Sequence, residues 1–226
     1  HRTRIEAIRR ERVTEDSRRN EAARHQAESI WQAATTVVSH PYLTRKGVRS
    51  YGLRENDGRL IIPMRDGGVI RSLQFIAPDG DKLFLREGRV SGCYFGIGKP
   101  DGTLCIAEGY ATGASVHEAT GLAVAIAFNA GNLIPVTKAL RAKFPDVRLI
   151  VCADDDVNTE GNPGLTKARA AVQTVGGLLA IPNFGDARPK GATDFNDLHQ
   201  QHGLEAIKRC IAAAETIGEP EPRPST

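Results

Sequence analysis

Residues 148–156 are Arg-Leu-Ile-Val-Cys-Ala-Asp-Asp-Asp, an apolar run that ends in three carboxylates. An earlier run, Leu-Cys-Ile-Ala at residues 104–107, ends in the same way in Glu108 and Gly109. A short apolar run between turn signals is typical of a buried parallel strand, and α/β sheets place their chemistry just beyond the carboxyl ends of such strands. We therefore expect acidic side chains from distant parts of the sequence to gather at one edge of a parallel sheet.

A third acidic group, Thr-Asp-Phe-Asn-Asp at residues 193–197, follows the next predicted strand, and Asp194 is its acid best placed to face this edge. Extended backbone would turn Asp154 and Asp156 to one side and Asp155 to the other. Gathered carboxylates repel one another unless a cation lies between them, and all-oxygen sites suit Mg²⁺ or Mn²⁺. Each acid alone also fits a helix cap or an Asx turn. Together they favour a divalent-metal site for phosphoryl transfer, with two ions.

The composition is that of an ordinary soluble globular protein, with 226 residues, 40% hydrophobic and 25% charged. The net charge of +3 is too small to indicate a nucleic-acid partner by itself. The four cysteines are scattered, so we expect reduced thiols, no zinc site and a cytoplasmic location. We see no membrane span and no signal peptide. The chain begins with His1 rather than Met, as a fragment of a larger protein would.

Four segments differ in their patterns. Residues 1–38 are rich in Arg, Glu and Ala and predict a charged, solvated or domain-connecting helix. Residues 39–102 contain short alternating runs between Asp-Gly turns, which is typical of an antiparallel β-rich lobe. Across residues 103–217 strands and helices alternate, which implies a parallel sheet flanked by helices. The Pro-rich residues 218–226 predict a disordered tail or linker. Helices of the third segment are expected near residues 113–119, 135–143, 164–175 and 203–214.

Three acidic motifs, in their order along the chain, resemble the TOPRIM domain. They are a strand ending in Glu-Gly, a strand ending in Asp-x-Asp and a later Asp-x-x-Asp. Bacterial-type primases, type IA and II topoisomerases and certain nucleases share this domain, and the resemblance covers about residues 103–215. Three segments upstream of this region are similar to segments of primases. They are His-Pro-Tyr-Leu at 40–43, Lys-Leu-Phe-Leu at 82–85 and Gly-Cys-Tyr-Phe-Gly at 92–96. The chain thus resembles the catalytic core of plasmid, phage and integrative-element DNA primases, including the TraC-like group. The implied fold is α/β, a TOPRIM domain preceded by a small antiparallel β-rich lobe and an N-terminal helix.

The resemblance also implies roles for individual residues. Glu108 would act as an acid/base or metal ligand, and Asp154, Asp156 and Asp194 would bind metal. Lys82 resembles a basic residue that contacts nucleotide phosphate or template. Apart from the resemblance, Gly109 would let the backbone bend sharply beside a ligand. For the basic residues Lys82, Arg86, Arg89 and Lys99 two interpretations stay open, a phosphate contact with template or triphosphate and a solvated hairpin charge.

Two positions depart from the family pattern. Many primases have an aspartate four residues after the glutamate, where this chain has Thr112. Asn196 stands where the later pair has an acid.

The implied activity is synthesis of short RNA primers from ribonucleoside triphosphates on single-stranded DNA, by a nucleotidyltransferase that uses Mg²⁺ or Mn²⁺. A helicase or another replication or conjugation domain is a further implied partner, and a membrane is not. Two alternatives stay open: a TOPRIM nuclease or topoisomerase-like enzyme that cleaves DNA, and a non-catalytic TOPRIM module that binds nucleic acid.

Overall fold

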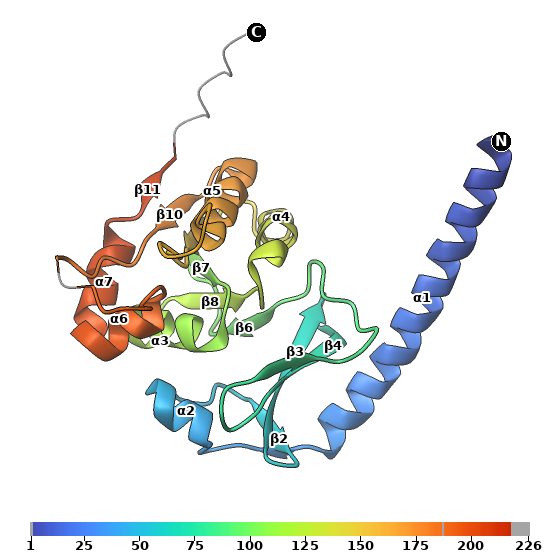
Figure 1. The fold of residues 1–226 in the computed structure, drawn as a ribbon, viewed down its shortest axis with the longest axis horizontal. Coiled ribbons are helices and arrows are strands. Elements are labelled where there is room, and N and C mark those ends of the chain that lie inside the picture. The colour runs from blue at the N-terminus through green and yellow to red at the C-terminus, as the bar shows by residue number, and fades with distance from the viewer. Residues whose placement is uncertain (1, 187, 218–226) are drawn as a thin grey trace, which may run out of the picture. The chain divides into compact units, whose positions relative to one another are not determined.

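The computed structural model describes residues 2–186 and 188–217, and the predicted tail at 218–226 lies outside them. The chain divides into two compact units. The first consists of His1–Arg45 and Arg49–Phe95, and the second of Lys46–Val48 and Gly96–Thr226. Figure 1 shows the elements of both units.

The first unit opens with the helix α1 (Arg2–Ala33). Its exposed surface is lined by ion pairs one turn apart, such as those from Glu15 to Arg18 and Arg19, both at 2.9 Å. Ala27 is buried, and the neighbouring Ile30 packs against the core of the β-rich lobe. The described helices, including the 32-residue α1, are too polar or too short to cross a membrane.

A five-stranded antiparallel sheet completes this unit, in the order β1-β2-β3-β4-β5. Tight turns produce it: Asp57 and Gly58 both have positive φ between β2 and β3, as do Gly67 and Gly68 between β3 and β4. This confirms the predicted antiparallel lobe. A short helix, α2, was not predicted. The elements are β1 (Thr35–Thr36), α2 (Pro41–Lys46), β2 (Arg54–Asn56), β3 (Arg59–Asp66), β4 (Val69–Ile76) and β5 (Lys82–Phe84).

The second unit contains a six-stranded sheet in the order β11-β10-β9-β7-β8-β6. Strands β8, β7, β9 and β10 run parallel, and the edge strand β11 pairs antiparallel with β10. Every residue of β7 is buried, which explains its continuous apolar sequence. The strands are β6 (Phe95–Ile97), β7 (Thr103–Ala107), β8 (Ala123–Ile126), β9 (Arg148–Cys152), β10 (Leu178–Ala180) and β11 (Glu215–Thr216).

Helices flank this sheet in two groups (Figure 1). Helices α3, α6 and α7 pack with one another, and α4 packs with α5. The fold is therefore the predicted α/β arrangement, although α6 was not expected as a separate helix. The helices are α3 (Tyr110–Thr120), α4 (Leu133–Lys143), α5 (Pro163–Val175), α6 (Phe195–His202) and α7 (Leu204–Ala212), with a 3-10 turn at Ala130–Asn132.

Candidate metal centre

The carboxyl ends of β7 and β9 lie side by side, because Ala107 at the end of β7 pairs in register with Cys152 at the end of β9. Glu108 follows the first strand directly, and Asp154 follows the second after one residue. The register thus places acids separated by more than forty positions in the sequence at one edge of the sheet, as predicted from their strands.

Glu108 stands between β7 and the first turn of α3, whose N-cap is Gly109. The helix lies very close to the sheet, since a Cβ on Gly113 would come within 2.1 Å of Cδ1 of Ile126. Tyr110 at the start of α3 is fully buried, which fits a packing role. Oε1 of Glu108 and Oδ1 of Asp154 are both shielded from solvent. The edge therefore presents carboxylate oxygens in a region of reduced solvation.

Asp156 is fixed against the start of α5. Its Oδ2 accepts a hydrogen bond from the Gly164 backbone N–H at 3.1 Å, and its own N–H donates to Oδ1 of Asn162 at 2.8 Å. Asn162 is the N-cap of α5, and Pro163 follows it in the first turn. The contact requires glycine at 164, because a Cβ there would lie 2.6 Å from the backbone oxygen of Asp154. The start of α5 thus holds the Asp156 carboxylate in place.

Asp155 has different partners from its two neighbours. Its Oδ2 accepts a hydrogen bond from Nη1 of Arg188 at 2.6 Å, and its Oδ1 accepts one from Nδ2 of Asn162 at 2.7 Å. Its backbone N–H donates to the Thr193 oxygen at 2.8 Å. Asp155 therefore connects the loop after β9 to the loop before α6, and it also contacts the N-cap of α5.

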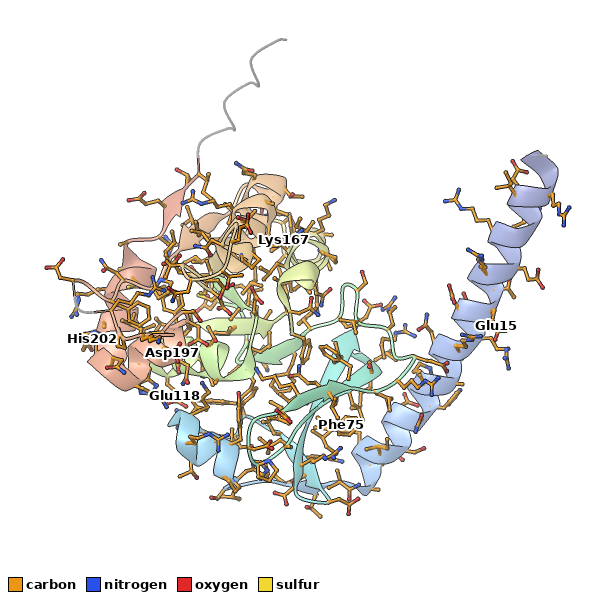
Figure 2. All side chains as sticks on the ribbon, in the orientation of Figure 1. Glu15, Phe75, Glu118, Lys167, Asp197 and His202 are labelled. Atoms are coloured by element: carbon orange, nitrogen blue, oxygen red, sulfur yellow. The ribbon has the colours of Figure 1, made fainter. Side chains whose placement is uncertain are left out.

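Asp194 is the N-cap of α6 rather than simply an acid at the edge. Its Oδ1 accepts a hydrogen bond from the Asp197 N–H at 2.8 Å, and Oδ2 of Asp197 accepts one from the Thr193 N–H at 2.9 Å. Figure 2 labels Asp197 at the start of this helix. Burial, and then the negative charge of Asp197, raise the pKa of Asp194. Asp194 thus keeps its proton to higher pH than an exposed aspartate.

The two departures from the family pattern both have structural partners. Oγ1 of Thr112 donates a hydrogen bond to Oδ2 of Asp194 at 3.1 Å. Asn196 is fully buried, and its Nδ2 donates to the Lys46 oxygen at 2.8 Å and to Oγ of Ser115 at 3.0 Å. An aspartate at 196 has no hydrogen to donate at that position when ionised. Asn196 is therefore a structural donor, and it does not face the site as a ligand.

The basic residues predicted to bind nucleotide or template fall on both units. Lys82 and Arg86 are exposed on the first unit, and Lys99 is exposed on the second. Arg89, also on the first unit, forms an ion pair with Asp66. Lys82, Arg86 and Lys99 thus have the exposure that phosphate contacts need, whereas Arg89 already has an acidic partner.

The donor set at the sheet edge suits a hard divalent cation, because Glu108, Asp154 and Asp156 offer carboxylate oxygens and no sulfur. In the part of the chain that the structure describes, no three acidic, His or Cys side chains already converge closely enough to hold an ion. Mg²⁺ is commonly bound through one or two carboxylates together with water and substrate phosphates, so a site of this kind does not need three converging side chains. The residues fit Mg²⁺ or Mn²⁺ chemically.

Two residues with a role in this region were not identified from the sequence. Asn162 carries an identifiable signal, since Asn-Pro-Gly at 162–164 is an N-cap followed by proline. Arg188 carries none, because nothing in a loop sequence indicates which carboxylate a distant arginine will contact.

Comparisons with known proteins agree with this geometry. Residues 103–205 match the family model described as the Toprim domain. Two Escherichia coli proteins, both named DNA primase TraC, are similar to the chain. One is 37% identical over 223 residues, covering 90% of this chain and 21% of the relative, and the other is 42% identical over 160 residues, covering 65% and 11%. The chain therefore spans about a fifth of the length of one relative and about a tenth of the other.

A solved structure has the same fold. The DnaG primase catalytic domain bound to single-stranded DNA superposes with a TM-score of 0.51 at 16% identity, covering 89% of this chain and 72% of that one. The fold and the strand-edge acids agree with the match of residues 103–205 to the Toprim domain. Residues 103–205 belong to the TOPRIM domain family, and the predicted resemblance of the chain to TraC-like DNA primases is confirmed.

Proposed function

We propose that this chain is the catalytic core of a DNA primase, a nucleotidyltransferase that makes short RNA primers from ribonucleoside triphosphates on single-stranded DNA. The observation that carries the proposal is the 37% identity to DNA primase TraC, which extends over both the β-rich lobe and the TOPRIM domain. Similarity confined to the TOPRIM domain would have fitted a nuclease or a topoisomerase equally well.

In this proposal Asp154 and Asp156 hold Mg²⁺ or Mn²⁺, and Asp194 contributes through the lone pairs that its capping bonds leave free. The ions, two in the fully loaded site, supply positive charge to the triphosphate and lower the pKa of the attacking hydroxyl. Glu108 accepts the proton of that hydroxyl or acts as a further ligand. Gly109, at the N-cap of α3, lets phosphate oxygens approach a helix N-terminus.

Positive side chains would hold the two substrates by their phosphates. Lys82, Arg86 and Lys99 are exposed and would contact template or triphosphate, since phosphate contacts position nucleic acid without reading sequence. Arg89 would do so after exchanging its partner Asp66. Because the relatives are much longer than this chain, we further propose that a helicase or another replication or conjugation domain completes the protein.

Primer synthesis tests this proposal directly. The chain is incubated with single-stranded DNA, labelled ribonucleotides and Mg²⁺ or Mn²⁺, and compared with Asp154→Ala/Asp156→Ala. The matched control is Asp146→Ala, which removes an exposed acid from the turn just before β9, at the other end of that strand from Asp154. Short RNA from the wild type and the control, and none from the double variant, is the expected result. DNA cleavage in the same tubes without RNA synthesis would instead identify a TOPRIM nuclease.

A further inference from the structure

Arg188 makes an unusually complete set of contacts for a loop residue. Its Nη1 donates to Oδ2 of Asp155 at 2.6 Å, and its Nη2 donates to the backbone oxygen of the same residue at 2.7 Å. Its Nε donates to the Ala192 oxygen at 2.8 Å, and its guanidinium lies 4.7 Å from the ring centroid of Phe184. All three guanidinium nitrogens are therefore engaged, and the side chain is held in one orientation.

These contacts join two segments that are distant in the sequence. Arg188 and Ala192 belong to the loop before α6, and Asp155 belongs to the loop after β9. Asn162, at the far end of the loop after β9, bonds both Oδ1 of Asp155 and the N–H of Asp156 just before α5. The network thus fixes the backbone on both sides of Asp155, and with it the directions in which the neighbouring carboxylates leave the chain.

The charge arrangement explains why an arginine is needed here. Three consecutive aspartates place three negative charges on one loop, and their repulsion opposes the compact turn. The Asp155–Arg188 pair is largely shielded, with side-chain exposures of 14% and 22%. The guanidinium donates to the carboxylate through Nη1 and to the backbone oxygen of Asp155 through Nη2, and this shielded arrangement is geometrically stricter than an exposed ion pair. Arg188 therefore neutralises the middle aspartate of the three.

We propose that Arg188, acting through Asp155, is a positioning residue that orients Asp154 and Asp156 for divalent-ion binding. This inference rests on the proposed function, since it concerns the ion site of the proposed primase core. It assigns Asp155 a role distinct from that of its two neighbours. It also explains how acids that do not yet converge in the described structure are kept close to a binding arrangement.

The direction of the change in Mn²⁺ affinity distinguishes a positioning role of Arg188 from a purely electrostatic one. Removing the positive charge of Arg188 from the neighbourhood of a cation would, by Coulomb's law alone, tighten ion binding. Removing a residue that orients the ligands weakens it, and loss of such supporting partners typically lowers metal affinity roughly 10- to 100-fold. The two accounts thus predict opposite changes in Mn²⁺ affinity for the same substitution.

The experiment measures Mn²⁺ binding by the loss of the free-ion electron paramagnetic resonance signal, with thermal unfolding and primer synthesis followed on the same preparations. The variants are Arg188→Ala, Arg188→Lys and the control Arg169→Ala, which removes an exposed arginine of α5. We expect Mn²⁺ affinity to fall about 10- to 100-fold in Arg188→Ala and less in Arg188→Lys, which keeps the charge but not the fork. Arg169→Ala should bind Mn²⁺ as the wild type does.

Each outcome has a defined meaning. Unchanged or tighter Mn²⁺ binding in Arg188→Ala would overturn the positioning role even if the unfolding temperature falls. Wild-type affinity in Arg188→Lys would also overturn it, and this variant serves if Arg188→Ala fails to fold. Absence of primers together with Arg188-dependent Mn²⁺ binding would refute the proposed function and leave the positioning role standing. Primer synthesis together with Mn²⁺ binding that does not depend on Arg188 would support the proposed function and refute the positioning role.

Discussion

Replacing Asn196 with aspartate should destabilise the second unit, although the change introduces the acid that the resemblance to the TOPRIM pattern implies at this position. The side chain is fully buried, and its Nδ2 donates to the Lys46 oxygen at 2.8 Å and to Oγ of Ser115 at 3.0 Å. In Asn196→Asp an acceptor oxygen would replace that donor and face the Lys46 carbonyl. The Ser115 hydroxyl already has a second partner, Nδ1 of His199, at 3.1 Å.

The cost follows from those contacts. Each of the two lost hydrogen bonds costs about 0.5–1.5 kcal/mol net, and a buried acceptor left without a donor adds about 1–3 kcal/mol, so we expect about 2–6 kcal/mol in total. For a protein of this size that loss lowers the unfolding midpoint by about 5–25 °C. The loss should be greater at pH 8 than at pH 5, because the new carboxyl group is charged at the higher pH.

Thermal unfolding followed by circular dichroism at both pH values tests this expectation. Asn158→Asp is the matched control, since it makes the same chemical change at an exposed position and should leave the midpoint almost unchanged. A midpoint for Asn196→Asp within about 2 °C of that control would refute the reasoning, given the scale of roughly 2–4 °C per kcal/mol. Asn196 would then not be the structural donor described here.

Three further predictions concern the same edge of the sheet. Because the pKa of Asp194 is raised in the folded state, the free energy of unfolding falls as pH rises through that pKa. Asp194→Asn lacks this titration, so in EDTA its unfolding temperature should rise relative to that of the wild type between pH 4 and pH 8. Thr112→Val removes a hydrogen bond that favours the ionised carboxylate, so it should steepen the same pH-dependent loss of stability. Gly164→Ala would place a Cβ 2.6 Å from the backbone oxygen of Asp154, so both Mn²⁺ affinity and thermal stability should fall. The control Gly96→Ala, whose Cβ meets open space, should leave Mn²⁺ affinity unchanged.

Much of the fold was predictable because its signals are local. The apolar runs that became β7 and β9, and the Asp-Gly turns of the first unit, each depend on a few adjacent residues. Helix α6 was missed because its N-terminal signal is a capping box formed by Asp194 and Asp197, and both acids had been assigned to the acidic motif. An acid can serve as a cap and a site residue at once, and the sequence does not separate the two roles.

The candidate site was predictable only in part for a related reason. Strand order placed Glu108 and Asp154 at one edge, and this follows from the parallel topology. The partners of Asp155 did not follow, because Arg188 lies 33 positions away in a loop with no periodic pattern. The structural role of Asn196 did not follow from the sequence either, because its hydrogen-bond acceptor, the backbone oxygen of Lys46, lies 150 positions away.

Formation of the first phosphodiester bond tests the central claim most directly. Dinucleotide synthesis from labelled ribonucleotides on single-stranded DNA is measured against Mg²⁺ concentration for the wild type, Glu108→Gln and the control Asp146→Ala. The account predicts template-dependent, Mg²⁺-dependent dinucleotide from the wild type and the control, and a rate reduced at least about 100-fold in Glu108→Gln, which is the scale of a lost general base. Equal rates for the wild type and Glu108→Gln would contradict the claim that the strand-edge acids are the catalytic centre.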